Sequence, residues 1–356
     1  MIPVTKPFLP ARQVFDKYID QIWERNWLTN DGPLVRMFEE RVRTYLGIRH
    51  FLFVANGTLA LQMAIKALNL RGEIITTPFS YVATTSSIVW ESCKPVFADI
   101  DEATLNINPS NIEAVISPRT VGILATHCFG NACDIHAIET IAQKHKLKVI
   151  YDAAHCFGSK FEGRCLFSYG DVATTSFHAT KLMHTVEGGG VSSNDPAIVE
   201  RMALMRNFGH SGSMNYKGVG INAKNSEIHA AVGLCVLESI DLILQRRKAQ
   251  CEYYDEVLSG LDVRKQSIFP GCDYNYAYYP IIFPNEQYCT KAKDMLERHG
   301  VFARRYFFPS LSQLEYVTRV EMPVSDSICG RILCLPLFHD LSEQDQDLIA
   351  KVLASV

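Results

Sequence analysis

Tyr151-Asp152-Ala153-Ala154-His155 and Ser176-Phe177-His178-Ala179-Thr180-Lys181 are the two stretches from which fold and site are predicted. An aspartate at the end of an apolar strand can pair with a protonated ring nitrogen. A lysine further along the chain can bond covalently to a carbonyl carbon. A covalent tether and a counter-ion for a pyridinium ring are what pyridoxal phosphate (PLP) requires of a protein. Together the two stretches predict a PLP site.

The first half of the chain alternates short apolar runs with helical patterns. Strands are expected at 51–54, 73–77, 95–99, 120–126, 147–151 and 172–177, and helices at 59–68, 83–91 and 135–145. Repeated alternation of this kind predicts an α/β fold with a mostly parallel sheet covered by helices on both faces.

The order of expected strands and helices is different in the second half of the chain. A long helix is expected from Ser226 to Arg247, followed by a strand at 276–283, where Pro280 predicts an edge position or a bulge. A chain of 356 residues exceeds one average core, so a large α/β domain over 1–245 and a small C-terminal α+β domain over 246–356 are predicted. Further elements are expected at 290–299 (helix), 331–336 (strand) and 342–353 (helix, capped by Ser342).

The composition argues against several classes of protein. A formal charge of −3 is not that of a nucleic-acid-binding chain. No apolar run is long enough to span a bilayer, and the first residues form no secretory signal, so we expect no membrane partner and a cytoplasmic location. The 11 cysteines are scattered and are expected to be reduced thiols. His127, Cys128 and Cys133 lack the spacing of a zinc site, so no metal is expected.

Other residues could complete a PLP site. Gly57 and Thr58 follow a strand and open a helix, whose first-turn amides attract a phosphate, although Thr58 could simply cap the helix. Ser176 could offer its hydroxyl to the same phosphate or cap the next turn. Tyr81 could stack on the ring or cover the core. His155 could donate to the ring hydroxyl or serve only the structure.

Several motifs in a fixed order resemble one known family across nearly the whole chain. They are Thr29-Asn30-Asp31-Gly32-Pro33, Asn56-Gly57-Thr58, Tyr151 to His155, Ser176 to Lys181, Glu187-Gly188-Gly189, Gly220-Ile221-Asn222, Arg304-Arg305-Tyr306-Phe307 and Leu335-Pro336-Leu337. In these motifs the chain is similar to PLP-dependent sugar-nucleotide aminotransferases of the DegT/DnrJ/EryC1/StrS group. The resemblance implies the fold-type I aminotransferase architecture and a homodimer whose active sites lie at the interface.

The resemblance also implies a role for each matching residue. Lys181 is the catalytic lysine that binds PLP covalently, and Asn222 reaches the phosphate from the partner subunit. Lys224 stands where the family often has arginine, so a point charge replaces a planar fork. The expected PLP contacts are Gly57, Thr58, Tyr81, Asp152, His155, Ser176, Lys181 and Asn222, and the expected substrate contacts are Thr29, Asn30, Lys224, Arg304 and Tyr306.

The run from His178 to Gly189 most resembles members that aminate C4 of dTDP-4-dehydro-6-deoxyglucose. Glutamate is the expected amino donor, dTDP-4-amino-4,6-dideoxyglucose the expected product, and bacterial surface polysaccharide (O-antigen, lipopolysaccharide) the expected destination. Alternatives are amination at C3, a UDP- or GDP-linked sugar, or a PLP-sensing regulator without catalysis. A related dehydratase would carry histidine at Lys181, and an NAD-dependent oxidoreductase would need a glycine fingerprint in its first βαβ unit.

Overall fold

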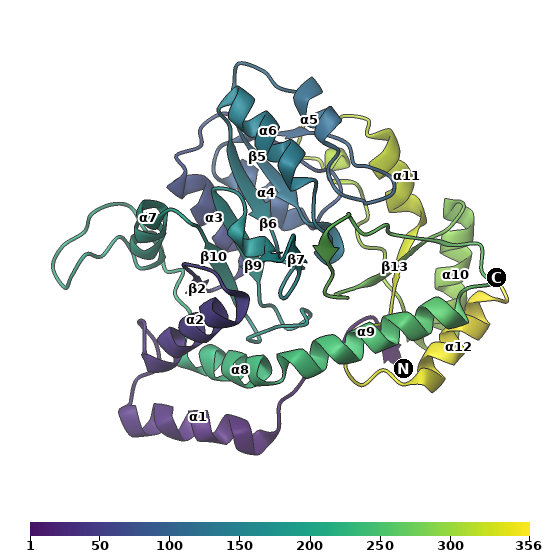
Figure 1. The fold of residues 1–356 in the computed structure, drawn as a ribbon, viewed down its shortest axis with the longest axis horizontal. Helices are drawn as coiled ribbons and strands as arrows, with labels where there is room; N and C mark the ends of the chain where they lie inside the picture. Colours follow the sequence, from purple (N-terminus) through teal and green to yellow (C-terminus); the bar gives the residue numbers. More distant parts are fainter.

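A seven-stranded sheet lies at the centre of the larger part of the molecule (Figure 1). The computed structural model describes all 356 residues. The strands of this sheet are β2 (Leu52–Val54), β3 (Glu73–Thr76), β4 (Lys94–Phe97), β5 (Thr120–Thr126), β6 (Lys148–Asp152), β9 (Val172–Ser176) and β10 (Gly189–Ser192). Their order is β2-β10-β9-β6-β5-β3-β4, with parallel neighbours from β9 to β4. The predicted mostly parallel sheet is confirmed. The prediction missed β10, which runs antiparallel to β2 and β9.

Helices bury both faces of this sheet. One face packs on α2 (Pro33–Leu46), α6 (Ile135–His145) and α8 (Glu227–Glu238), and the other on α3 (Gly57–Ala67), α4 (Val82–Trp90) and α7 (Pro196–Arg206). α1 (Arg12–Arg25) packs on the outer side of α8 (Figure 1). Successive residues of a strand point to opposite faces of the sheet. Ile123 and Tyr151 belong to the core on the first face, and Leu124 and Ile150 belong to the core on the second. This period of two, with both faces apolar, explains the continuous apolar runs in the sequence.

A smaller sheet with its own core forms the second part of the molecule. Its strands are β11 (Arg264–Lys265), β13 (Tyr279–Ile282) and β15 (Ile332–Leu335), packed with α10 (Glu286–Arg298), α11 (Pro323–Arg331) and α12 (Glu343–Leu353). β13 is the central strand, so the predicted edge position of Pro280 is wrong. Pro280 faces Cys334 of β15, but β11 reaches only Ile281 and Ile282. One side of the proline therefore has no strand partner, which accommodates its missing N–H.

Two helices replace the single helix predicted from Ser226 to Arg247. Ser239 separates α8 from α9 (Ile240–Val257). The Ser239 N–H donates to the Val236 carbonyl at 3.0 Å, three residues back, which tightens the last turn of α8 and ends it. α9 contributes Ile243 to the large core and Tyr254 to the small core. The expected domain boundary at residues 245 and 246 falls inside α9 and stays a prediction.

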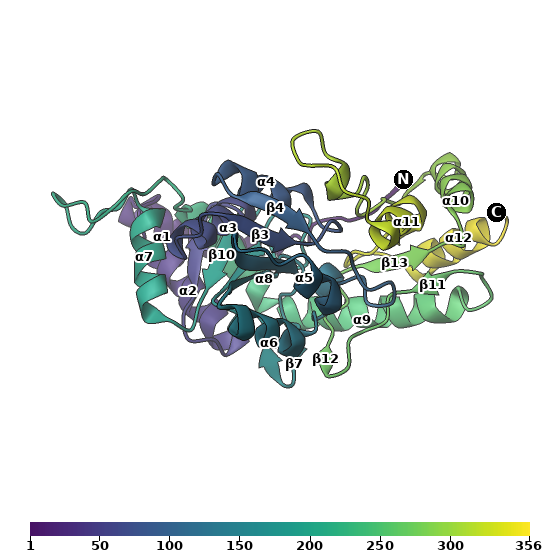
Figure 2. The ribbon, with the colours of Figure 1, turned by 90° about the horizontal axis from the view of Figure 1, so that it is seen from above.

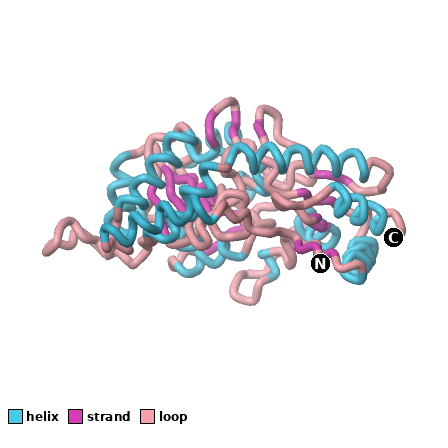
Figure 3. Tube along the Cα trace, turned by 90° about the horizontal axis from the view of Figure 1, so that it is seen from below, coloured by secondary structure: helices cyan, strands magenta, loops and turns pink.

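The ends of the chain lie at the same end of the molecule (Figure 3). β1 (Ile2–Pro3) pairs in parallel with β14 (Val301–Phe302) beside the small core. Ser342 caps α12, as predicted. The remaining elements are α5 (Pro109–Ala114), β7 (Lys160–Phe161), β8 (Arg164–Cys165) and β12 (Cys272–Asp273). No helix has both the length and the apolar character required to cross a membrane.

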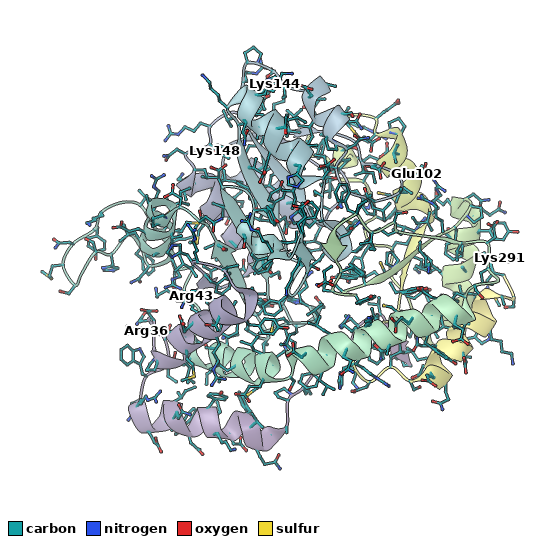
Figure 4. All side chains as sticks on the ribbon, viewed as in Figure 1. Arg36, Arg43, Glu102, Lys144, Lys148 and Lys291 are labelled. Carbon is teal, nitrogen blue, oxygen red and sulfur yellow. The ribbon has the colours of Figure 1, made fainter.

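Glu102 joins the two parts of the molecule. Figure 4 places it beside α11. Its carboxylate accepts hydrogen bonds from Arg331 at 2.7 Å and from Arg264 at 3.3 Å, and both arginines belong to the small part. Glu102 follows β4 and belongs to the large part. These bonds help to hold the small part in place over the carboxyl ends of the large sheet.

Glu73 links the amino-terminal ends of three neighbouring strands of the large sheet. It opens β3 and is buried at 4% exposure. Its carboxylate accepts hydrogen bonds from Ser117 at 2.5 Å, from Arg119 at 2.8 Å and from Lys94 at 3.3 Å. These partners lie at the starts of β4 and β5, so one side chain ties three parallel strands. The hydrogen bonds from Ser117 and Arg119 lower the pKa of Glu73 to about 2.

We predict that Glu73→Gln destabilises the protein more at neutral pH than in acid. The folded-state pKa of about 2 lies below the ordinary value of 4.5. The carboxylate therefore stabilises the fold above pH 4.5, and this contribution is lost as the pH falls towards 2. At pH 7 the melting temperature should drop by about 2–4 °C. Thermal unfolding followed by circular dichroism from pH 7 to pH 3 tests this, and a constant difference across that range would contradict it.

Candidate active site

A cavity of about 470 Å³ lies between the carboxyl ends of the large sheet and the small part. It brings together residues that are up to about 250 positions apart in the sequence. Nine of the predicted site residues line it: Gly57, Thr58, Tyr81, Asp152, His155, Ser176, Lys181, Arg304 and Tyr306. Carboxyl ends of parallel strands are where open α/β sheets bind their ligands.

The N-terminus of α3 forms one end of the cavity. Its cap is Asn56, whose side chain accepts from the Leu59 N–H at 2.8 Å, so the alternative assignment of the cap to Thr58 is wrong. The first amides of the helix, at Gly57 and Thr58, have no carbonyl partner within it. A Cβ on Gly57 would lie 2.9 Å from the Ser176 Cβ, so glycine lets the helix start approach β9 closely. This end of the cavity suits an anion.

Asp152 lies on the floor of the cavity at the end of β6. Its Oδ2 accepts from the Thr84 hydroxyl at 2.8 Å, and its Oδ1 accepts from the Ala154 N–H at 3.1 Å. Burial raises the pKa of Asp152, and the two hydrogen bonds and the nearby Lys181 oppose that rise. The carboxylate is therefore oriented by the protein but has no cation in direct contact with it.

Lys181 enters the same cavity from the loop between β9 and β10. Its Nζ donates to the Tyr278 hydroxyl at 3.2 Å, and no ion pair joins it to Asp152. Burial lowers the pKa of Lys181, and the Asp152 charge partly opposes this. A larger fraction of the amine is therefore unprotonated and able to attack a carbonyl carbon at neutral pH.

His155 forms part of the aromatic wall of the cavity. Its Nδ1 accepts from the Phe129 N–H at 3.1 Å, so the proton of the neutral ring is on Nε2. Burial holds the pKa of His155 well below its ordinary value. The Tyr278 and Phe307 rings lie 4.8 Å and 5.9 Å from it between centroids. The sequence prediction did not include Tyr278, because it lies in the second half of the chain outside any motif.

The two neighbouring arginines of the Arg304-Arg305 motif differ in position. Arg304 lines the cavity, and its guanidinium lies 4.8 Å from the centre of the Tyr306 ring. Arg305 points away and pairs with Glu286 at 2.7 Å. Arg304 has no carboxylate partner within the chain, so its charge is available to a bound anion.

Four predicted residues lie outside the cavity of their own chain. Thr29 and Asn30 are exposed. Lys224 Nζ donates to the Asn222 side chain at 2.8 Å, and Lys224 lines a separate cavity of about 260 Å³ with Asp31. The single chain thus leaves these residues apart from Lys181.

An arm over residues 207–222 projects from the large part beyond α7 (Figure 2). Antiparallel bridges join Asn207 to Asn222 and His210 to Tyr216. The arm exposes the large apolar side chains Phe208, Met214, Tyr216, Val219 and Ile221. An apolar surface of this kind is typical of a segment that contacts another protein.

Comparisons with known proteins agree with this geometry. Two similar proteins, both called dTDP-4-amino-4,6-dideoxy-D-glucose transaminase, come from Shigella dysenteriae (37% identity) and Escherichia coli (36% identity). Each alignment covers 99% of this chain and 98% of the relative. A crystal structure of DesI, determined in the presence of its TDP-sugar product, superposes with a TM-score of 0.94 at 32% identity, covering 99% of this chain and 92% of DesI.

The family model described as DegT/DnrJ/EryC1/StrS aminotransferase matches residues 11–354. The match spans the sheet, the cavity and the small part, and the expected resemblance is confirmed. This chain belongs to the DegT/DnrJ/EryC1/StrS aminotransferase family.

Proposed function

We propose that the protein is a PLP-dependent sugar-nucleotide aminotransferase. In this proposal it moves the amino group of L-glutamate to C4 of dTDP-4-dehydro-6-deoxyglucose and so serves surface polysaccharide synthesis. The observation that carries the proposal is the placement of Lys181 and Asp152 in one cavity without direct contact. The names of the similar proteins favour a 4-keto, dTDP-linked sugar over a 3-keto or a UDP- or GDP-linked one.

The residues of the cavity fit PLP. The start of α3 and the Ser176 hydroxyl offer donors to a phosphate at one end. Asp152 offers a carboxylate to a ring nitrogen, and His155 offers an N–H to a ring hydroxyl. Tyr81, at the mouth of the cavity, can cover the ring face. Lys181 supplies the amine that binds the cofactor.

When bound, PLP acts as an electron sink for the carbon that carries the transferred amine. Asp152 keeps the ring nitrogen protonated, and the positive ring in turn stabilises the buried carboxylate. Lys181 would hold the cofactor covalently, and the Lys181 Nζ could also move a proton to or from the substrate carbon. Tyr278 holds this Nζ in position through its hydroxyl. Arg304 offers its charge to the pyrophosphate of the sugar nucleotide.

In a homodimer, the four residues that lie outside the cavity of their own chain would contribute to the site of the partner. The arm carries Asn222, and its exposed apolar side chains are the natural contact with a second copy of the chain. Docked on the partner, the arm could present Asn222 and Lys224 to the partner's phosphate and substrate. Thr29 and Asn30 would contact the sugar nucleotide from the same direction.

Lys181→Ala is expected to abolish turnover. The purified wild-type protein with PLP should show a visible absorption band that borohydride abolishes while leaving the cofactor permanently attached, because Lys181 holds the cofactor through a reducible covalent bond. The variant should lack this covalent label and should lose more than about 1000-fold in kcat, since no other amine lines the cavity. Mass spectrometry of the reduced protein and steady-state kinetics measure the two effects. Full turnover by the variant would refute the assignment.

Asp152→Asn is expected to weaken PLP binding by about 10- to 100-fold, the range for one hydrogen bond to a charged group. The amide cannot pair with a protonated ring nitrogen in the same way. Fluorescence titration of the apoprotein measures the change. Asp99→Asn is the matched control, because Asp99 is also buried and bonded to Ser325 but lies outside the cavity. Equal losses in both variants would point to a general folding defect.

Mixing two variants tests the shared site. Lys181→Ala and Asn222→Ala should each be poorly active alone. If Asn222 serves the partner's Lys181, each mixed dimer contains one site with both wild-type residues. Random reassortment makes about half of the dimers mixed, and each mixed dimer has one intact site of two. Roughly one quarter of the wild-type activity should therefore return. If each chain completes its own site, mixing restores nothing. Sedimentation velocity of the same samples checks that they are dimers.

A further inference from the structure

A histidine and a glutamate in the wall of the cavity have no role in the chemistry described so far. His178 Nε2 lies 3.7 Å from Glu187 Oε1, and both residues line the cavity that contains Lys181. The two side chains are 47% and 57% exposed. They are therefore accessible to a ligand that enters the cavity from solvent.

Backbone hydrogen bonds fix the pair beside the reacting amine. Both residues belong to the loop between β9 and β10. The Phe177 N–H donates to the Gly188 carbonyl at 2.7 Å, which joins the two ends of the loop next to the pair. The Lys181 N–H donates to the His178 carbonyl at 2.9 Å, which closes a tight turn between them. A group bound by the pair therefore lies in the same cavity as the Lys181 amine.

The hydrogen bonds of His178 define which nitrogen faces the ligand. Its Nδ1 accepts from the Thr180 N–H at 3.2 Å and lies 2.8 Å from the Thr180 hydroxyl. A nitrogen that accepts carries no proton, so Nε2 is the N–H of the neutral ring. The distance of 3.7 Å to Glu187 is longer than the 2.7–3.2 Å of an N–H···O hydrogen bond. The cavity thus presents one donor and one acceptor that do not satisfy each other.

A hydroxyl group matches this arrangement, because it accepts one hydrogen bond and donates another. We infer that His178 and Glu187 bind the sugar hydroxyl on the carbon next to the reacting carbonyl. His178 Nε2–H donates to the hydroxyl oxygen, and Glu187 accepts its proton. This inference rests on the proposed function, since it requires a keto sugar as the second substrate. Glutamate has no hydroxyl, so the pair determines specificity only in the sugar half of the reaction.

Separate measurement of the two half-reactions tests the inference. Stopped-flow absorbance of the holoenzyme follows the reaction with glutamate first and with the keto sugar nucleotide second. Glu187→Ala and His178→Ala should lower the rate with the sugar, relative to the rate with glutamate, by about 10- to 100-fold. His178→Gln, whose amide can reach the Nε2 position, should recover part of the loss.

A sugar nucleotide that lacks this hydroxyl provides the second arm. The wild type should use the deoxy analogue about 10- to 100-fold less well than the parent sugar, whereas Glu187→Ala should use the two sugars at similar rates. The matched control is Glu162→Ala, because Glu162 also faces a histidine, His136, at 3.1 Å but lies outside the cavity. This control should leave both half-reactions unchanged.

Two results would overturn the inference alone. In the first, the wild type uses the deoxy analogue and the parent sugar at equal rates. In the second, the variants slow both half-reactions equally, which is expected if the pair only stabilises the loop that carries Lys181. A wild-type holoenzyme whose spectrum does not respond to glutamate would instead overturn the proposed function, and this inference with it.

Discussion

The close approach of β2, β9 and β10 is the constraint on which the site depends. Gly189 of β10 lies so near the backbone of Asn56 that a Cβ would overlap it, and Gly57 is close to Ser176 in the same way. Side chains at these glycines would push the start of α3 away from β9. The helix amides and the loop of Lys181 would then no longer share a cavity. Glycine is required here by the packing distance and not by backbone dihedral angles.

The cavity is polar at its floor and aromatic at its wall because two cores meet there. The polar residues Asp152 and Lys181 come from the large part, whereas Tyr278 and Phe307 come from the small part. The floor would cost free energy if its charges stayed buried without partners, and their shifted pKa values record that cost. A bound cofactor with a cationic ring and an anionic phosphate would relieve it. On the proposed function, cofactor binding would therefore stabilise the folded site.

Much of the fold and of the cofactor cavity could be predicted, because strand ends and motifs are local in sequence. Asp152 ends β6 and Lys181 follows β9, its parallel neighbour, so their proximity follows from the strand order. β10 was missed because glycine is a poor strand former, and the packing that favours it there is not local. Tyr278 belongs to no motif, and its position in the cavity depends on how the two cores pack together. Asn222 matched the family and Lys224 replaced its usual arginine, but the position of a second chain is not encoded in any spacing.

The pairing of β1 with β14 has a consequence for the order of assembly. Ile2 and Val301 are about 300 residues apart, so this contact closes one of the longest loops the chain can form. During synthesis the partner strand of β1 leaves the ribosome only after the whole large sheet has done so. The first residues must therefore wait, exposed, while that sheet folds. A fusion partner attached at that end would hinder the last step of maturation more than the first.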